Sequence, residues 1–172
     1  MKRFPFIAIL VLLATVRTAS AQVGDSPKTD PRLIKALKEA NLEYTELPNG
    51  DCKLLVTTSD EEGDGEESRT QIVFIRSSTY KLGNIEIREI SSVGWDGAEE
   101  PSALVANTLL QGNAQSKIGA WEVSQMRDSS YIAVFTVKTS PDIAAETLET
   151  IVFAVAYTAD RMEKKLKNKD EW

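Results

Sequence analysis

The densest group of potential ligand atoms lies at residues 59–68, SDEEGDGEES, which hold six carboxylates and two glycines. Aligned with an EF-hand calcium loop, four residues match positions 1, 3, 5 and 6: Asp60, Glu62, Asp64 and Gly65. Position 12, which should be a bidentate glutamate, is Gln71, and the flanks alternate as strands do. The sequence favours a solvated loop between two strands, with a low-affinity calcium site or docking of a basic partner as alternatives.

Histidine is absent from the chain, and cysteine occurs once, as Cys52. Without histidine the protein has no Ser-His-Asp or Cys-His catalytic site, no His-ligated zinc and no ordinary neutral-pH proton shuttle. A single cysteine excludes an intramolecular disulfide and a CxxC redox site. Cys52 alternates with Leu54 and Val56, which predicts a buried, inert thiol, with an intermolecular disulfide or a reactive thiol as alternatives.

Carboxylates alone could support glycosidase-type catalysis, but their spacing selects no acid and base pair. The acids considered for this role are Glu86, Glu89, Asp96, Glu99, Glu100 and Glu122. The serine pairs at residues 91–92 and 129–130 lie in no SxxK arrangement or nucleophile elbow, and the chain has no Gly-rich phosphate loop. We therefore expect a protein that is not an enzyme, with no catalytic residues, no cofactor and no metal ligands.

Residues 1–21 have the pattern of a secretory signal peptide. Two basic residues precede a short apolar core at residues 4–16, and Ala19-Ser20-Ala21 gives the small residues that signal peptidase accepts. The apolar run is too short for a comfortable membrane span. The sequence predicts cleavage before Gln22 and a periplasmic or secreted protein, with a retained N-terminal anchor as the alternative.

The predicted mature chain has the size and charge of an acidic single domain. Removing residues 1–21 leaves 151 residues, enough to bury one core. It also leaves 17 basic residues against 26 acidic ones, a net charge of −9. So acidic a chain gains nothing from counterion release on nucleic acid and has no basic stripe for anionic lipid. We expect no nucleic-acid partner and no membrane span after signal cleavage.

Hydrophobic periodicity predicts one α+β domain over residues 30–172, after a polar lead-in at residues 22–29. The expected helices cover residues 31–40, 101–110 and 140–167. The expected strands cover residues 42–47, 52–58, 70–77, 84–91, 117–126 and 131–139. The order α-β-β-β-(β)-α-β-β-α is typical of an antiparallel sheet with helices packed on it.

Local signals set the expected boundaries of these elements. Asp30-Pro31 and Ser140-Pro141 each combine a helix cap with proline in the first turn. Gly112-Asn113 is expected to end the middle helix, and residues 94–97 to form a loop. Residues 70–77 include a run that is apolar on both sides, which predicts a central strand covered on both faces.

The last helix carries two apolar faces. Six residues at helical spacing form the stripe expected to lie on the sheet: Leu148, Ile151, Val155, Ala159, Met162 and Leu166. Phe153 and Tyr157 lie four residues apart and project roughly opposite that stripe. Because one sheet covers one side only, these two are candidate partner-contact residues. The first helix, a second copy of the chain in a homodimer, or a foreign partner or ligand could cover them.

Four stretches together resemble the YbjN family, which is grouped with the type III secretion chaperone-like fold: LIKALKEANLEYTEL, LLQGNAQSKIGAWEV, YIAVFTVKTS and IVFAVAYTADRMEKKL. The resemblance covers residues 31–167, and its most telling pieces are Leu109-Leu110 with Asn113, Gly119-Ala120-Trp121 and Ala159-Asp160. It implies an α-β-β-β-α-β-β-α domain that often dimerises, acts through protein contacts and has no known catalytic residues. No functional site residues carry over from the family.

These observations together predict a non-catalytic, exported protein-binding module. We expect it to be chaperone-like or regulatory and to form a homodimer, with Phe153 and Tyr157 in contact with the partner. The alternative is a periplasmic module that binds a small ligand or, with low affinity, calcium.

Overall fold

The computed structural model describes residues 28–58 and 69–167. The predicted signal peptide, most of the polar lead-in and the acidic segment 59–68 lie outside the described residues. The described elements are α1 (Pro31–Glu39), β1 (Thr45–Glu46), β2 (Cys52–Thr58), β3 (Arg69–Ile75), β4 (Tyr80–Leu82), β5 (Ile85–Gly97), α2 (Ala103–Gln115), β6 (Ala120–Gln125), β7 (Tyr131–Thr139) and α3 (Ala145–Lys167). The predicted α+β class is confirmed.

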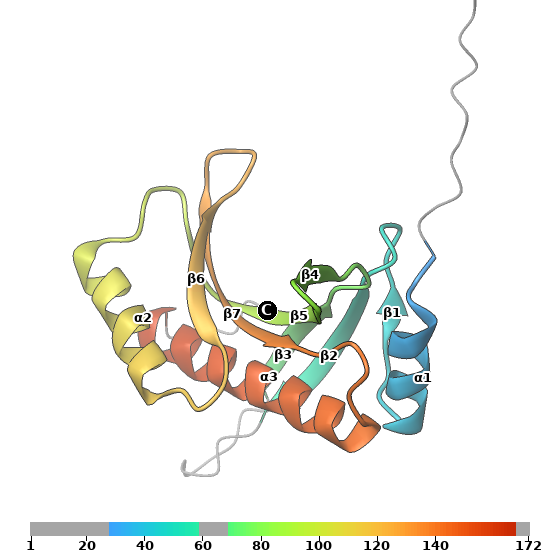
Figure 1. Ribbon diagram of the computed structural model, residues 1–172. Coiled ribbons are helices and arrows are strands. Elements are labelled where there is room, and N and C mark those ends of the chain that lie inside the picture. The colour runs from blue at the N-terminus through green and yellow to red at the C-terminus, as the bar shows by residue number, and fades with distance from the viewer. Residues whose placement is uncertain (1–27, 59–68, 168–172) are drawn as a thin grey trace, which may run out of the picture.

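The strands form one curved antiparallel sheet in the order β1-β2-β3-β5-β7-β6, and β4 pairs with the start of β5 beside this path. Figure 1 shows α3 crossing one face of the sheet, with α1 beside β1 at one edge and α2 beside β6 at the other. The opposite face has no helix over it among the described residues (Figure 1). The sheet is therefore closed on one side only.

The core lies between α3 and the closed face of the sheet. Five of the six residues predicted for the α3 stripe are buried, and Leu166 is half-buried against the core. They meet alternate strand residues that point toward the helix, including Val73, Ile90 and Phe135. Each such side chain contributes roughly 1.5–3 kcal/mol when fully buried, so this layer carries most of the fold's stability.

The ends of α1 follow the sequence signals. The Asp30 carboxylate accepts a hydrogen bond from the Arg32 backbone N–H at 2.9 Å, as expected of an N-cap ahead of proline. Asn41 has a φ of 53°, the left-handed conformation that ends a helix. Both predicted boundaries are confirmed.

Two predicted helix boundaries are wrong. The middle helix α2 continues through Gly112-Asn113 to Gln115, because both residues make contacts with Trp121 that favour the helical conformation. The last helix α3 begins at Ala145 rather than Ser140. The Ser140 hydroxyl accepts a hydrogen bond from the Asp142 backbone N–H at 3.2 Å, so it caps a short turn before the helix.

Two predictions about the central strands are also corrected. Residues 94–97 belong to β5, which continues past a bulge at Gly94 and pairs with β7 as far as Gly97. The predicted burial of both faces of β3 is wrong, because Ile72 and Phe74 on the open face are only half-buried. An antiparallel sheet can leave one face toward solvent, and this sheet does so.

Candidate functional site

The candidate site is built where α2 is joined to the edge strand β6. The Asn113 carboxamide oxygen accepts a hydrogen bond from the Trp121 backbone N–H at 2.6 Å, and its NH2 group donates to the Trp121 carbonyl at 3.4 Å. The side chain thus pairs with the strand edge as a neighbouring strand would. A Cβ on Gly112 would lie 3.1 Å from both Met162 Cε and Trp121 Nε1, so glycine allows α2 to approach the indole closely.

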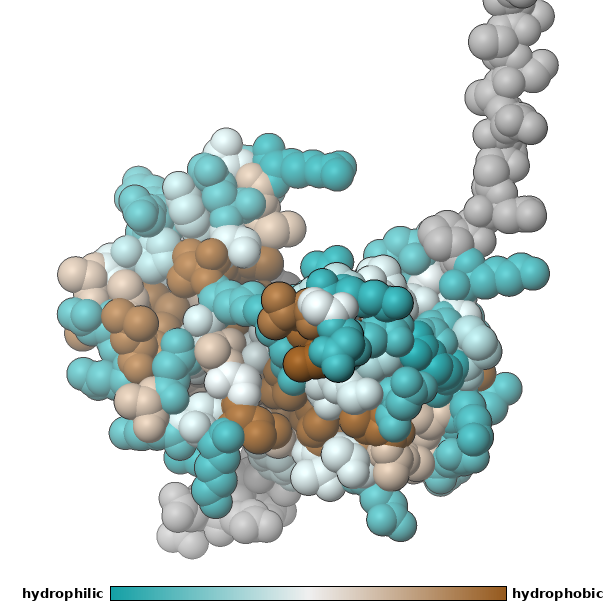
Figure 2. Space-filling model, viewed as in Figure 1, coloured by the Kyte–Doolittle hydropathy of each residue, from teal (hydrophilic) through white to brown (hydrophobic). Residues whose placement is uncertain are grey.

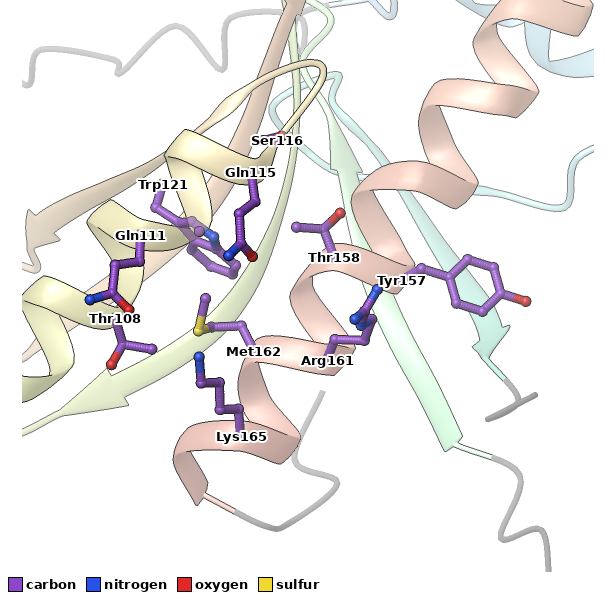
Figure 3. Close-up of a pocket in the computed structure, with 11 residues that line it drawn as sticks. Thr108, Gln111, Gln115, Ser116, Trp121, Tyr157, Thr158, Arg161, Met162 and Lys165 are labelled. Carbon is purple, nitrogen blue, oxygen red and sulfur yellow. The ribbon is translucent and has the colours of Figure 1, made fainter. Parts of the chain in front are cut away.

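The indole of Trp121 is the floor of a cleft of about 320 Å³ between α2 and α3 (Figure 3). Met162 of α3 completes the floor. One wall is a single face of α2 and the other a single face of α3. The principal wall residues are Thr108, Gln111 and Gln115 on α2 and Thr158, Arg161 and Lys165 on α3. Figure 3 places Thr108 near Lys165 and Gln115 near Thr158, so the two helices run antiparallel along the cleft.

The cleft presents hydrogen-bond donors and positive charge. Arg161 and Lys165 are exposed, one helical turn apart, and neither pairs with an acid in the described part of the chain. Trp121 is 7% exposed, and its indole N–H makes no hydrogen bond within the described ranges. The hydroxyls of Thr108 and Thr158 instead donate to carbonyls of their own helices at 2.8 and 2.7 Å. This arrangement can bind a ligand that accepts hydrogen bonds or carries negative charge.

Phe153 and Tyr157 lie on the outer side of α3. Their ring centroids are 6.5 Å apart with 33° between the planes, and the residues are 36% and 38% exposed. Tyr157 is among the residues that line the cleft, but its ring points away from the cleft (Figure 3). Helix α1 contacts α3 but leaves these rings exposed, so cover by the first helix is not what the structure shows. A second copy and a foreign partner or ligand remain as the predicted coverings.

Further apolar side chains are exposed away from α3. Figure 2 shows apolar atoms near β4 and beside α2. The exposed residues there include Leu82 of β4, Ile85 of β5, and Leu104 and Leu110 of α2. Of the thirteen residues in α2 only Leu109 is buried, so this helix offers more apolar surface to a partner than an ordinary surface helix does.

The acids considered for catalysis do not gather at the cleft. Four of them form ion pairs with basic side chains: Glu86 with Arg32, Glu89 with Arg76 and Lys138, Glu122 with Lys138, and Asp96 with Lys167. Glu99 and Glu100 are exposed. None of the six is among the described residues that line the cleft, and the two that share a partner, Glu89 and Glu122, are both held by the Lys138 ammonium.

A buried charge cluster was missed by sequence reasoning. Arg69, at the start of β3, pairs with Asp160 at 2.6 Å and with Glu163 at 3.3 Å. Both acids lie on the core side of α3 and are buried. The available signal was a pair of acids three residues apart within an otherwise apolar helix face, where charged residues need partners. These residues do not line the cleft, and their ion pairs join α3 to the start of β3.

Of the five residues aligned with the EF-hand loop, the structure describes Gln71. Asp60, Glu62, Asp64 and Gly65 lie outside the described residues. Within the described ranges, no group of three or more His, Cys, Asp or Glu side chains could hold a metal. Gln71, the residue at EF-hand position 12, is buried in β3 and donates hydrogen bonds to the Ser92 hydroxyl and the Val93 carbonyl. Its side chain therefore faces the core.

The only cysteine is fully buried in β2, as predicted. Burial raises the pKa of the Cys52 thiol to about 11, because the thiolate would lose its hydration. The neutral thiol packs in the core as a small apolar side chain.

No family model and no solved structure matches the chain. Over 122 residues the sequence is 27% identical to the DNA mismatch repair protein MutL of Wolbachia sp. subsp. Brugia malayi (strain TRS). This match covers 67% of the present chain and 19% of the relative, so the chain spans about a fifth of the protein it resembles. None of the described helices is long and apolar enough to cross a membrane.

Proposed function

We propose that this protein is a non-catalytic, exported protein-binding module of the YbjN type that associates as a homodimer through the outer face of α3. The observation that carries the proposal is the contact between Phe153 and Tyr157, which leaves both rings exposed on a helix whose other side is buried. Thr150 and Ala154 are small neutral residues beside this aromatic pair, and the charged residues Glu149 and Arg161 lie one helical turn before and after it, at the rim of such a contact.

The energy available at the aromatic pair is moderate. A large aromatic side chain offers roughly 150–250 Å² for burial. With a little over a third of each residue exposed, burial of the remainder contributes roughly 1–2 kcal/mol per ring. A two-fold symmetric dimer uses the same patch twice, so four rings supply about 4–8 kcal/mol before the cost of association. The dimer is therefore expected to be reversible.

The size of the protein in solution tests this proposal. We expect the exported protein to behave as a dimer in light scattering coupled to gel filtration, and the Phe153→Asp and Tyr157→Asp variants to behave as monomers. Both rings are exposed, so each variant should keep the circular dichroism spectrum of the wild type. Thr147→Asp is the matched control, because Thr147 is an exposed α3 residue outside the aromatic pair, and this variant should remain dimeric.

A monomeric wild-type protein, with both aspartate variants equally well folded, would show that the aromatic pair is not a dimer contact. Dissociation of the Thr147→Asp control would show that added charge anywhere on α3 is sufficient, and would remove the specific role of Phe153 and Tyr157.

A further inference from the structure

We propose that the cleft between α2 and α3 is a binding site for a small organic anion with an apolar body, such as an alkyl carboxylate or an alkyl phosphate. This proposal does not depend on the homodimer, because the cleft is complete within one chain, and Tyr157, although it is one of the residues lining the cleft, turns its ring away from it (Figure 3).

The size and lining of the cleft suit a small molecule. Its volume of about 320 Å³ is at the lower end of the range found for small-molecule sites, roughly 300–1,000 Å³. Trp121 and Met162 give an aromatic and a polarisable apolar surface on the floor. Polar side chains form the walls, so an apolar body is received at the bottom and a charged head group at the rim.

The charges of the walls select an anion. Of the described residues that line the cleft, Arg161 and Lys165 are the charged ones, and both are basic. Asp160 and Lys167 of the same helix, in contrast, pair with Arg69 and Asp96. Although the chain has a net charge of −6, these two neighbouring cations pair with no acid in the described ranges. An anionic head group would supply the missing charge.

The hydrogen-bonding groups point to the same ligand. The indole N–H of Trp121, the Arg161 guanidinium and the Lys165 ammonium can only donate. Gln111 and Gln115 on the facing wall can turn their amide NH2 groups toward the same ligand. A carboxylate or phosphate accepts from several of these donors at once, whereas a cationic head group is repelled and accepts from none.

Three ten-carbon probes that differ in their head groups test the proposal by isothermal titration calorimetry. They are decanoate, decyl phosphate and decyltrimethylammonium, each kept below its critical micelle concentration. We expect the two anions to bind with one site per chain and the cation to give no heat above dilution. Binding of both anions would assign the site to anionic head groups in general, and binding of one of them would name the preferred head group.

Cleft variants connect this binding to named residues. Arg161→Gln and Lys165→Gln should each weaken decanoate binding about tenfold or more, and Gln111→Glu, which places a negative charge in the cleft, should abolish it. All three side chains are exposed, so the fold should be retained and checked by circular dichroism. Lys164→Gln is the matched control, because it removes the same charge from the neighbouring position outside the cleft and should bind as the wild type does.

Three results would overturn the proposal. One is the absence of binding by either anion to folded protein. Another is equal binding of decanoate and decyltrimethylammonium, because this would mark a nonspecific apolar surface. The third is unchanged affinity in all three cleft variants. A glutamate-rich peptide is titrated in parallel, and heat from the peptide without heat from decanoate would assign the cleft to an acidic protein segment instead.

Discussion

The buried guanidinium of Arg88 makes its partner Asp30 the most informative residue for stability. Arg88 lies on the closed face of β5, is 2% exposed, and donates to Asp30 Oδ2 at 2.6 Å and to the carbonyls of Arg76 and Ser77. Asp30 is also the N-cap of α1, so one carboxylate joins the first helix to the centre of the sheet. We predict that Asp30→Asn is strongly destabilising.

The expected loss follows from what an asparagine side chain can and cannot replace at this position. Breaking a buried ion pair by removing one charge typically costs 3–5 kcal/mol. An asparagine retains the capping oxygen, and Arg88 retains two carbonyl acceptors, so we expect a loss of about 2–3 kcal/mol. The control is Arg32→Gln, because Arg32 binds the same carboxylate at 2.8 Å but its side chain is 37% exposed. The Arg32→Gln variant should lose about 1 kcal/mol or less of the free energy of unfolding.

The same pair predicts an acid limb in the stability profile. The Arg32 side-chain hydrogen bond, followed by the Arg32 backbone N–H and Arg88, lowers the pKa of Asp30 to about 2. Since the folded pKa lies below the unfolded one, near 3.8, this stabilisation is present above about pH 4 and is lost as the pH falls toward 2. With solvent screening, the pH-dependent part is on the order of 1 kcal/mol.

Urea unfolding followed by tryptophan fluorescence at pH 7, 5 and 3 measures both effects. The difference in the free energy of unfolding between the wild type and Asp30→Asn should have its full value of about 2–3 kcal/mol at pH 7 and pH 5, and it should be smaller at pH 3. The reasoning would be refuted if Asp30→Asn lost less than about 0.5 kcal/mol of the free energy of unfolding at pH 7, or if Arg32→Gln lost more of it than Asp30→Asn does. Either result would mean that the buried guanidinium is satisfied by carbonyl groups alone.

Three further perturbations concern the core and the floor of the cleft. Native Cys52 should not react with Ellman's reagent until the protein is unfolded in urea, and rapid reaction without urea would contradict its burial and raised pKa. Asn113→Ala should lower the free energy of unfolding in urea by about 1–2 kcal/mol, because the Trp121 backbone N–H and carbonyl both lose their hydrogen bonds to Asn113. An unchanged free energy of unfolding would mean that water replaces these hydrogen bonds. Gly94→Ala should lower the free energy of unfolding by about 2 kcal/mol or more and shift the tryptophan emission. The added Cβ would lie 2.5 Å from Trp121 Cη2 and 3.0 Å from the Ala159 carbonyl oxygen. A variant as stable as the wild type would contradict the tight packing around Gly94.

Elements set by local signals were predictable from the sequence. The cap at Asp30 and the left-handed Asn41 depend on neighbouring backbone groups, so their residue types reveal them. The strand Cys52–Thr58 was predicted with its observed bounds, because its alternation reflects a single buried face. The α3 stripe was predictable for the same reason, since the period of a helix fixes which residues share a side.

Features set by tertiary contacts were predicted wrongly or missed. Glycine and asparagine at positions 112–113 are typical of a helix end, but here Gly112 allows the approach of Trp121 and Asn113 binds its backbone. The bulge at Gly94 likewise depends on a ring from another strand. The cleft itself combines residues from α2, β6 and α3, so no spacing within one segment could reveal it. Within one segment, the only feature that pointed to the cleft was the pair of basic residues at positions 161 and 165, one helical turn apart.

The placement of acids along α3 explains how a strongly acidic chain can keep a cationic cleft. Asp160 precedes Arg161 in sequence, and an exposed aspartate there would compete with any anionic ligand for the guanidinium. Instead its side chain is turned to the core side, where Arg69 of β3 pairs with it and with Glu163. The sheet therefore holds the negative charges of this segment on one side of the helix and leaves Arg161 and Lys165 on the other. On this reasoning, the buried cluster that joins α3 to β3 also preserves the positive potential of the cleft.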